Sequence, residues 1–500
     1  MKKIILSSLA FLILLSGCSK VLDVDSVRTV SEKNMWNTLE DARAGLLGIY
    51  ALSRAAMVDN NAHWLYGDVR PKTFTSPNRP DLNAIINNSL NASFPTLDAL
   101  SDWTRWFAVV NAANLFIERV GDVKKADPRY SDTYLSIDVA QARFLRAFAY
   151  FYMVRIWGDV PLIISSHDGQ FDKLPREKQA KVLAWVEEEL LSASVKLPFI
   201  YSSNDPQQPG NYYNETHSRW LGTLATKNSA YAVLSHVAAW QGDYYSTAVY
   251  TKFVIDNRAK SNIDYTGSDD LVAGGGLFNG RKDRHILGFN AEWGHNDGST
   301  SGHIEELTLA EPVVIKKMPD IYLPKDTILA LFNEQDDARF NIDTLGNALS
   351  TRYITNFNGK YPIFSKIKAI QGGNGDPNFR YFTSVALFTR YEDIVLLRAE
   401  ALAVLGDVPG ATEMLNNIRS RRALANYNID VNGDLIDAIF KERKRELIGE
   451  GHNWYDLIRY TRIKPRAVMT NLINSGGIYW PISKKVLNQN SLLTQNPYWN

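Results

Sequence analysis

The stretch Lys227–Asp243, KNSAYAVLSHVAAWQGD, decides the fold because it has the pattern of one helix that ends at a Gly-Asp stop. The apolar residues recur at the spacing of one helix face, at Ala230, Tyr231, Leu234 and Ala238. A glycine directly after a helix can adopt the left-handed conformation that ends it, and an aspartate after that glycine can cap a following helix. We therefore predict a helix here that leads into a second helix.

Two further stretches repeat this pattern, Gln141–Asp159 and Glu392–Asp407. Each is rich in alanine and large apolar residues and ends at Gly-Asp, although the spacing between the three stretches is uneven. Ala248 and Ala411 follow the second and third turns and are small enough for paired helices to approach closely. This is the pattern of tetratricopeptide helical hairpins. The predicted fold is mostly α, with a tetratricopeptide-like hairpin scaffold inside one larger domain.

A segment of different character, from about 261 to 388, lies between the second and third hairpins. It has little helical periodicity and contains glycine runs such as Gly274–Gly276. We interpret it as a loop-rich insertion with short strands, and loops on a rigid scaffold often carry binding residues. Further helices are predicted over about 39–53 and 103–120, separated by a proline-rich loop segment over about 59–98.

The first residues have the layout of a bacterial lipoprotein signal. Lys2 and Lys3 precede about a dozen apolar residues, too few to cross a bilayer, which takes roughly twenty. Leu15-Ser16-Gly17-Cys18 then fits the lipobox, and Cys18 is the only cysteine in the chain. We predict acylation of Cys18, with this lipid as the only attachment to a membrane. The predicted organisation is a signal peptide over 1–17, a lipidated tether over 18–30 and a single domain over 31–500.

The charge of the chain is nearly balanced, with 55 basic and 54 acidic residues before Lys2 and Lys3 are removed with the signal. No strong positive field is present to gather nucleic acid, so no nucleic-acid partner is expected. With a single cysteine, the chain forms no internal disulfide. Aromatic residues make up 11% of the chain, and those that are exposed could stack on the apolar faces of sugar rings.

A set of short motifs extends from about residue 23 to the C-terminus. The most specific is the run Glu442–Leu447, which continues through Gly449–Gly451 and Trp454 to Asp456-Leu457 and Arg459. The other motifs are Glu40–Gly45, Asn111–Leu115, Ala142–Ala147, Trp157–Pro161, Arg390–Asp393, Arg398–Ala401, Leu415–Arg419, Trp480–Ile482 and Gln495–Tyr498. Together they resemble the motifs of the SusD/RagB family of surface nutrient-binding lipoproteins of Bacteroidetes.

This resemblance implies a helical fold with a loop-rich ligand face. It also implies a place on the outer membrane over a SusC-like TonB-dependent transporter, which receives the captured ligand. Some relatives carry an acidic cluster directly after the lipidated cysteine, but here Ser19-Lys20-Val21-Leu22 intervenes before an aspartate. The expected function is non-catalytic capture of oligosaccharide. The alternatives are peptide capture, a structural lid on the transporter and, in a different class, a lipid-anchored glycoside hydrolase.

The run from Glu442 to Arg459 could be mistaken for a catalytic cluster because it contains carboxylates and His452. On a helix, however, Glu442 and Arg445 are i,i+3 neighbours, a pairing that stabilises helices. The glycines that follow are predicted to end this helix before Trp454. The sequence contains no HExxH motif that would give His452 a zinc-binding partner. We interpret the run as structural and expect no catalytic residues, no metal ligands and no cofactor, with a structural calcium left open.

The best candidate for ligand binding is the loop His63–Arg70, HWLYGDVR. It combines aromatic rings, which can stack on sugars, with a carboxylate and a guanidinium, which can bond vicinal hydroxyls. It also resembles the Gly-Asp-Val-Arg segment near the ligand side of the family. The structural alternative is that the tryptophan is buried and that the two charged groups fix the loop. The predicted ligand-binding residues are Trp64, Tyr66, Asp68 and Arg70 in this loop, Trp293 and Asn296 in a glycine-rich segment, and Arg352 and Arg380 elsewhere in the insertion.

Overall fold

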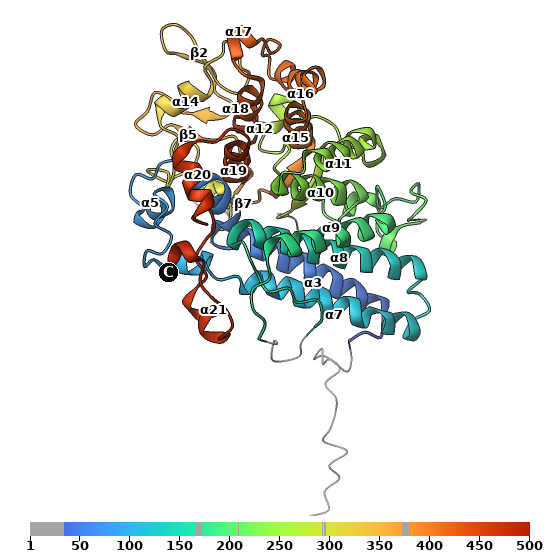
Figure 1. The fold of residues 1–500 in the computed structure, drawn as a ribbon. Helices are drawn as coiled ribbons and strands as arrows, with labels where there is room; N and C mark the ends of the chain where they lie inside the picture. The colour runs from blue at the N-terminus through green and yellow to red at the C-terminus, as the bar shows by residue number, and fades with distance from the viewer. Residues whose placement is uncertain (1–34, 167–172, 209, 293, 295–296, 373–379) are drawn as a thin grey trace, which may run out of the picture.

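Long helices dominate the computed structural model, in which about 53% of the chain is helical. The described residues are 35–166, 173–208, 210–292, 294, 297–372 and 380–500. The long helices are α3 Leu39–Val58, α7 Thr104–Ala126, α8 Asp132–Trp157, α9 Gln179–Lys196, α10 Lys227–Gln241, α11 Tyr244–Asp256, α15 Tyr391–Val404, α16 Val408–Arg421, α18 Leu435–Leu447 and α19 Asn453–Ile463. Figure 1 shows them stacked in layers, from α3 and α7 at the bottom to α16 and α18 at the top.

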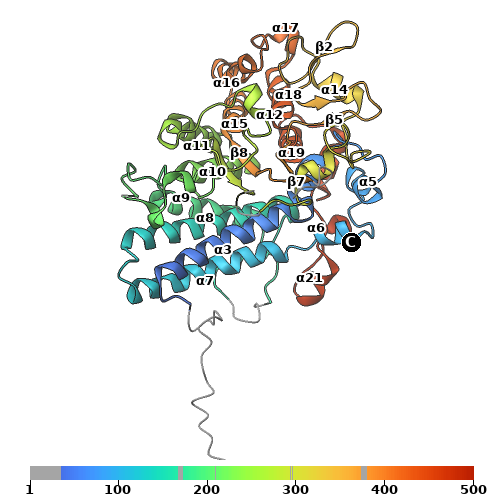
Figure 2. The same ribbon diagram turned by 180° about the vertical axis from the view of Figure 1, so that it is seen from behind.

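The helices pack in an order that follows the chain. α3 packs on α7, α7 on α8, α8 on α9, α9 on α10 and α10 on α11. α15 packs directly on α11 and then on α16, although the whole insertion separates α11 from α15 in sequence. From behind, Figure 2 shows α3 and α7 side by side beneath α8. The predicted scaffold of helical hairpins is confirmed.

The Gly-Asp stops work as predicted in two of the three stretches. α10 ends at Gly242, which has φ 82°, and the Asp243 carboxylate accepts a hydrogen bond from the Ser246 backbone N–H at 3.0 Å to start α11. Gly406 has φ 86°, and Asp407 caps α16 in the same way. One local signal therefore ends one helix and starts the next.

The first stretch uses the same chemistry over a longer connection. α8 ends before Gly158, which has φ 75°, and no helix follows directly. The Asp159 carboxylate instead accepts a hydrogen bond from the backbone N–H of Gln179, the first residue of α9, at 2.9 Å. The aspartate thus caps the partner helix from across a loop.

The insertion between α11 and α15 is closed by a pair of buried strands. β1 His285–Phe289 pairs antiparallel with β8 Ala386–Arg390, and every residue of both strands is buried. The prediction of loops with short strands is confirmed. The other elements of the insertion are α12 Ser268–Val272, α13 Ile304–Thr308, α14 Lys325–Leu331, and the antiparallel pairs β2 Asn341–Ile342 with β3 Ala348–Ser350, β4 Ile354–Thr355 with β5 Ile363–Phe364, and β6 Ile370–Gly372 with β7 Arg380–Phe382.

The segment after α3, predicted to be loops, contains several short helices. Pro80 and Pro95, expected to break regular structure, instead stand at the first position of α5 and α6, where proline lacks no needed hydrogen bond. The short helices and helical turns of the chain are Asp59–Asn61, α4 Ala62–Trp64, Leu65–Val69, α5 Pro80–Ile86, α6 Pro95–Leu100, Tyr212–Asn214, His217–Arg219, Arg258–Ser261, α17 Ile429–Asn432, α20 Ala467–Asn474, α21 Lys484–Gln489 and Pro497–Trp499.

The predicted signal peptide, Cys18 and the tether lie outside the described residues. Across the described ranges, no helix combines the length and the apolar character needed to cross a membrane. The largest hydrophobic core within them joins side chains from Trp36 to Val486.

Candidate ligand-binding site

The aromatic residues of the predicted binding loop lie in the interior. Trp64 is 2% exposed and Tyr66 is 4% exposed. The Tyr66 hydroxyl donates a hydrogen bond to the Leu100 carbonyl oxygen at 2.6 Å, and its ring packs edge-to-face on Trp157 and Trp480. A ring that stacks on a sugar needs an open face. The expectation that Trp64 and Tyr66 are stacking platforms is therefore corrected, because both are core residues.

Asp68 is buried as well, and it joins this loop to the most specific motif of the chain. Its carboxylate accepts hydrogen bonds from the Gly451 backbone N–H at 2.5 Å and from Asn453 Nδ2 at 2.9 Å. Burial raises the pKa of Asp68 to about 7, despite the hydrogen bond from Gly451. Asp68 therefore fixes the loop through distant partners, and its expected contact with a ligand hydroxyl is corrected.

Arg70 has a similar structural role. Its guanidinium donates hydrogen bonds to the carbonyl oxygens of Gly477 and Ile478 and to the Asn88 side chain. The guanidinium carbon lies 4.1 Å from the centroid of the Trp454 ring. These contacts use its donors inside the protein, but Arg70 also lines an open pocket of about 550 Å³. Its role in binding hydroxyls therefore stays a prediction.

The two predicted arginines of the insertion stand in different segments of it. Arg352 donates a hydrogen bond to Asp269 at 2.7 Å and another to the Ala338 carbonyl oxygen at 2.9 Å. Arg380 is half-buried and opens β7, where it pairs with Gly372 of β6. Neither borders the pocket described next, so the structure does not bring them together with the other candidates.

An open pocket of about 530 Å³ lies beside the C-terminal end of α3. This volume is within the range of small-molecule sites, about 300–1,000 Å³. Three segments form it, namely the end of α3 with the turn after it, the start of α7, and a stretch of the insertion. Its polar lining residues are Arg54, Asp59 and Asn60 from the first segment, Arg105 from the second, and Asp297, Ser299, Ser301 and His303 from the third.

Two exposed arginine–carboxylate pairs stand at this pocket. Arg54 Nη1 lies 2.7 and 2.6 Å from the two carboxylate oxygens of Asp297, and Arg105 pairs with Asp59. Between 25% and 53% of each of these four side chains is exposed. Exposed pairs contribute only about 0–1 kcal/mol to stability, so these groups can exchange partners with a ligand at little cost. Two positive and two negative charges also leave the pocket without net charge.

Glu306 joins the turn after α3 to the insertion. Its Oε2 accepts hydrogen bonds from Asn61 Nδ2 at 2.8 Å and from the Gly302 backbone N–H at 3.1 Å. Gly302 has φ 75°, and a Cβ there would lie 3.1 Å from the Val58 carbonyl oxygen. Only glycine combines this conformation with so close an approach. Asn60 has φ 59°, which asparagine tolerates better than most residues, and it lies at the pocket in the turn Asp59–Asn61 that follows α3.

His303 forms a buried wall of the pocket. Its Nδ1 lies 3.0 Å from Ser384 Oγ, and burial lowers the pKa of His303 to about 4. The imidazole is therefore neutral at pH 7 and adds no charge to the pocket.

Trp293 and Asn296, the other two predicted ligand-binding residues, lie outside the described residues. Glu292 comes directly before this segment and Asp297 directly after it. The Asp297 backbone N–H donates a hydrogen bond to the Glu292 carbonyl oxygen at 3.2 Å. Asp297 itself lines the pocket. A role for Trp293 and Asn296 stays a prediction, at a segment whose neighbour borders the pocket.

The sequence did not single out the charged residues of the pocket. Arg54 and Arg105 stand on the polar faces of ordinary helices, and nothing in their local pattern separates them from other surface arginines. The one available signal was the pair Asn60-Asn61 directly after a helix, since consecutive asparagines favour a left-handed turn. The asparagine pair predicts a turn, but it does not predict that the turn borders a pocket.

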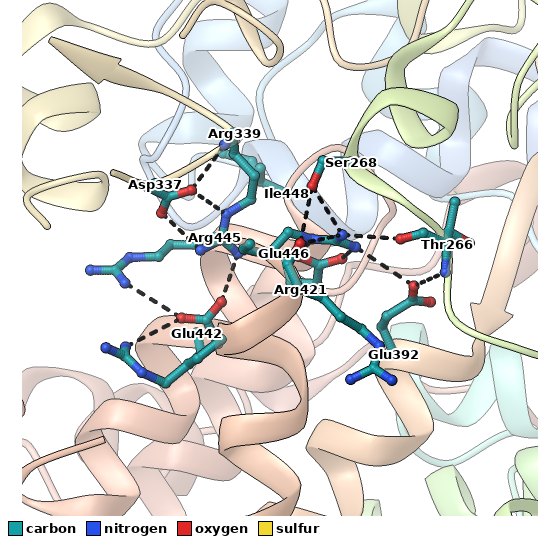
Figure 3. Close-up of polar contacts among 12 residues, drawn as sticks. Thr266, Ser268, Asp337, Arg339, Glu392, Arg421, Glu442, Arg445, Glu446 and Ile448 are labelled. Carbon is teal, nitrogen blue, oxygen red and sulfur yellow. Dashed lines mark hydrogen bonds and ion pairs between the residues drawn. The ribbon is translucent and has the colours of Figure 1, made fainter. Parts of the chain in front are cut away.

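The most specific motif instead forms a buried network of ion pairs, shown in Figure 3. Glu446 accepts hydrogen bonds from Arg339 at 3.1 Å, from Arg390 at 2.9 Å and from Arg422 at 2.7 Å. All four side chains are 0% exposed. Burial by itself would raise the pKa of Glu446, but Arg422 and Arg390 hold it well below its usual range. Glu446 is thus the carboxylate hub of the network.

The network ties the insertion to the C-terminal helices. Glu450 pairs with Lys366 of the insertion and lies 2.8 Å from Arg390 at the end of β8. Glu442 and Arg445 pair at 3.4 Å, as predicted from their helical spacing. The helix also ends before Gly449, in agreement with the sequence. The structural interpretation of this run is confirmed.

Comparison with known proteins identifies a family. Residues 211–467 match the model of the SusD family. The crystal structure of a SusD superfamily protein from Bacteroides thetaiotaomicron VPI-5482 has 43% sequence identity and a TM-score of 0.86, covering 93% of this chain and 100% of that chain. SusD-like protein P38 of Formosa agariphila is 27% identical over 544 residues, which cover 100% of both chains.

A more distant structure shares the fold alone. B. fragilis NanU has 18% sequence identity and a TM-score of 0.70, with 95% of this chain and 100% of that chain covered. The helical scaffold thus persists where most of the sequence has changed.

Proposed function

The chain belongs to the SusD family, and on this premise we propose that it is a non-catalytic cell-surface lipoprotein that captures oligosaccharide. In this proposal, the lipid on Cys18 anchors the protein in the outer membrane. The captured ligand passes to a SusC-like TonB-dependent transporter, which is the proposed partner.

The observation that carries the proposal is the open pocket beside α3. Its two arginine–carboxylate pairs are exposed, and together they carry no net charge. A neutral ligand rich in hydroxyls suits such a lining, because each hydroxyl can donate to a carboxylate and accept from a guanidinium. Oligosaccharides have this chemistry along their whole length.

The same geometry favours binding over turnover. A glycosidase uses one carboxylic acid to protonate the leaving group and a second carboxylate across the sugar. Asp59 and Asp297, the carboxylates of the pocket, both contact arginines. That arrangement suits them to accept hydrogen bonds rather than to deliver protons.

The test is a calorimetric titration of residues 19–500 with plant, host and microbial oligosaccharides and with mixed oligopeptides, followed by analysis of the products. We expect saturation near one oligosaccharide per chain, with the ligand recovered intact. Saturation by peptides only would favour the peptide-capturing alternative. Cleaved products would contradict the proposal and identify a hydrolase. Binding to the transporter without any ligand binding would identify a structural lid.

The matched variants are Arg54→Gln and Arg43→Gln. Both arginines lie on α3 in partly exposed pairs, but Arg43 pairs with Glu215 away from the pocket. We expect Arg54→Gln to lower affinity about tenfold, the usual scale for a lost charged hydrogen bond, and Arg43→Gln to leave affinity unchanged. Equal effects of the two variants would place the ligand elsewhere.

A further inference from the structure

A second pocket, of about 380 Å³, lies between α18 and α19. It has no lining residue in common with the pocket beside α3. Lys441 and Lys444 line it from α18, three residues apart and therefore on one face of the helix. Arg466, directly before α20, lines the same pocket.

The cations of this second pocket have no carboxylate partner among the described residues. Lys441 Nζ donates a hydrogen bond to Asn333 Oδ1 at 2.7 Å, and Arg466 Nη2 donates one to the Tyr460 hydroxyl at 2.9 Å. Lys444 is partly buried and has no polar partner in the described part of the chain. Its neighbours in the motif, by contrast, are paired inside the protein.

The carboxylates of the same pocket are already neutralised. Asp437 lies 2.8 Å from Lys464 Nζ. Asp456 lies 2.9 Å from Arg443 and 2.8 Å from Arg459. The pocket therefore presents surplus positive charge, in contrast to the balanced pocket beside α3.

The floor of the second pocket is aromatic. Phe440 and Tyr460 are buried and meet edge-to-face, with ring centroids 5.2 Å apart. Pro71 and Leu457 add apolar surface beside them. The pocket thus combines an apolar floor, suited to a ring or an aliphatic body, with ammonium groups suited to an anion.

We propose that the second pocket is a binding site for a carboxylate ligand with an apolar or ring-shaped body, anchored through Lys444. An ammonium that is partly buried without a partner destabilises the protein, since burial disfavours the charged form. Burial indeed lowers the pKa of Lys444. A bound carboxylate supplies the missing partner and removes this cost.

Two sources of carboxylate fit this chemistry, an acidic sugar and the C-terminus of a peptide. The test titrates residues 19–500 with trigalacturonate and with N-acetyl-trialanine, each beside its uncharged counterpart, the methyl ester and the C-terminal amide. We expect at least one acid to bind and its uncharged counterpart to bind about tenfold more weakly or not at all. The acid that binds identifies whether the carboxylate of the ligand comes from a sugar or from a peptide. Binding of neither acid, or equal binding of acid and counterpart, would overturn the proposal.

The anchoring role is tested with Lys444→Met and Lys441→Met against Lys484→Met, which changes an exposed lysine of α21 outside both pockets. Lys444→Met should lower carboxylate affinity about tenfold while its melting temperature is unchanged or higher, because an unpaired ammonium is removed. Lys441→Met should weaken binding less, and Lys484→Met not at all. Unchanged affinity in both Lys444→Met and Lys441→Met would overturn the assignment.

This proposal stands apart from oligosaccharide capture at the first pocket. A neutral oligosaccharide should not compete with the bound carboxylate, and Arg54→Gln should leave carboxylate affinity unchanged. Competition between the two ligands, or loss of carboxylate binding in Arg54→Gln, would overturn the second site.

Discussion

The network around Glu446 and the pocket beside α3 use the same chemical pair, arginine with carboxylate, for different ends. In the network the side chains are 0% exposed, and one carboxylate binds three arginines. In the pocket each carboxylate has one arginine, and at least a quarter of each side chain faces solvent. Breaking a buried ion pair leaves an uncompensated charge in the interior, whereas water replaces the lost partner of an exposed ion pair. Solvent exposure, not residue type, separates the structural pairs from those available to a ligand.

The largest expected effect is that of Glu446→Ala, which removes the hub of the network. Arg339, Arg390 and Arg422 would be left as buried charges lacking their shared partner. We expect a loss of about 3–5 kcal/mol in the free energy of unfolding, measured by urea denaturation. A loss below about 1 kcal/mol, the scale of exposed pairs, would contradict the contrast between the two regions.

Trp64→Ala tests whether the predicted binding loop is core. Removing a buried tryptophan should cost about 3 kcal/mol or more, because Trp64 lies in the main hydrophobic core. At temperatures where the variant is folded, its oligosaccharide affinity should equal that of the wild type. A stable variant with lost binding would restore Trp64 as a stacking platform.

Asp68 should give the stability a pH dependence. Its pKa is raised from the ordinary 3.8 to about 7 in the folded protein, so the folded state holds this proton more tightly than the unfolded chain does. The resulting stabilisation is fully present below pH 3.8 and is lost as the pH rises towards 7.

We measure this with Asp68→Asn, which cannot titrate. Between pH 4 and pH 8, the unfolding free energy of the wild type should fall relative to that of the variant by roughly 3–4 kcal/mol. Glu305, whose pKa burial also raises to about 7, is present in both proteins and cancels in this difference. A difference that is constant with pH would contradict the raised pKa of Asp68.

The smallest expected change in stability is that of Asp297→Ala at the pocket. Its pair with Arg54 is exposed, so the free energy of unfolding should change by about 0–1 kcal/mol. Oligosaccharide affinity should nevertheless fall, because Arg54 loses the partner that positions it. Unchanged affinity together with a large loss of stability would assign this pair to the structural class.

Local patterns in the sequence predicted the parts of the fold that depend on near neighbours. The Gly-Asp stops at Gly242 and Gly406 are one example, and the pairing of Glu442 with Arg445 is another. The prolines at Pro80 and Pro95 were misread because proline both breaks a helix and begins one. Whether a proline breaks a helix or begins one depends on the packing of the residues after it.

The candidate site was much less predictable. His63–Arg70 has the composition of a sugar-binding loop, yet several of its side chains contact residues hundreds of positions away, such as Asp68 against Gly451. The pocket unites Arg54, Arg105 and Asp297, which no spacing in the sequence connects. A list of suitable residue types cannot state which of them face solvent.

The sequence by itself determined the helical hairpins, the loop-rich insertion and the near-neutral charge, because these follow from helix periodicity, capping and composition over short stretches. The tertiary structure alone decided that the motif-bearing charges are buried and that unremarkable arginines line an open pocket. Burial and convergence depend on contacts between segments far apart in the chain, and those contacts form only when the whole core packs.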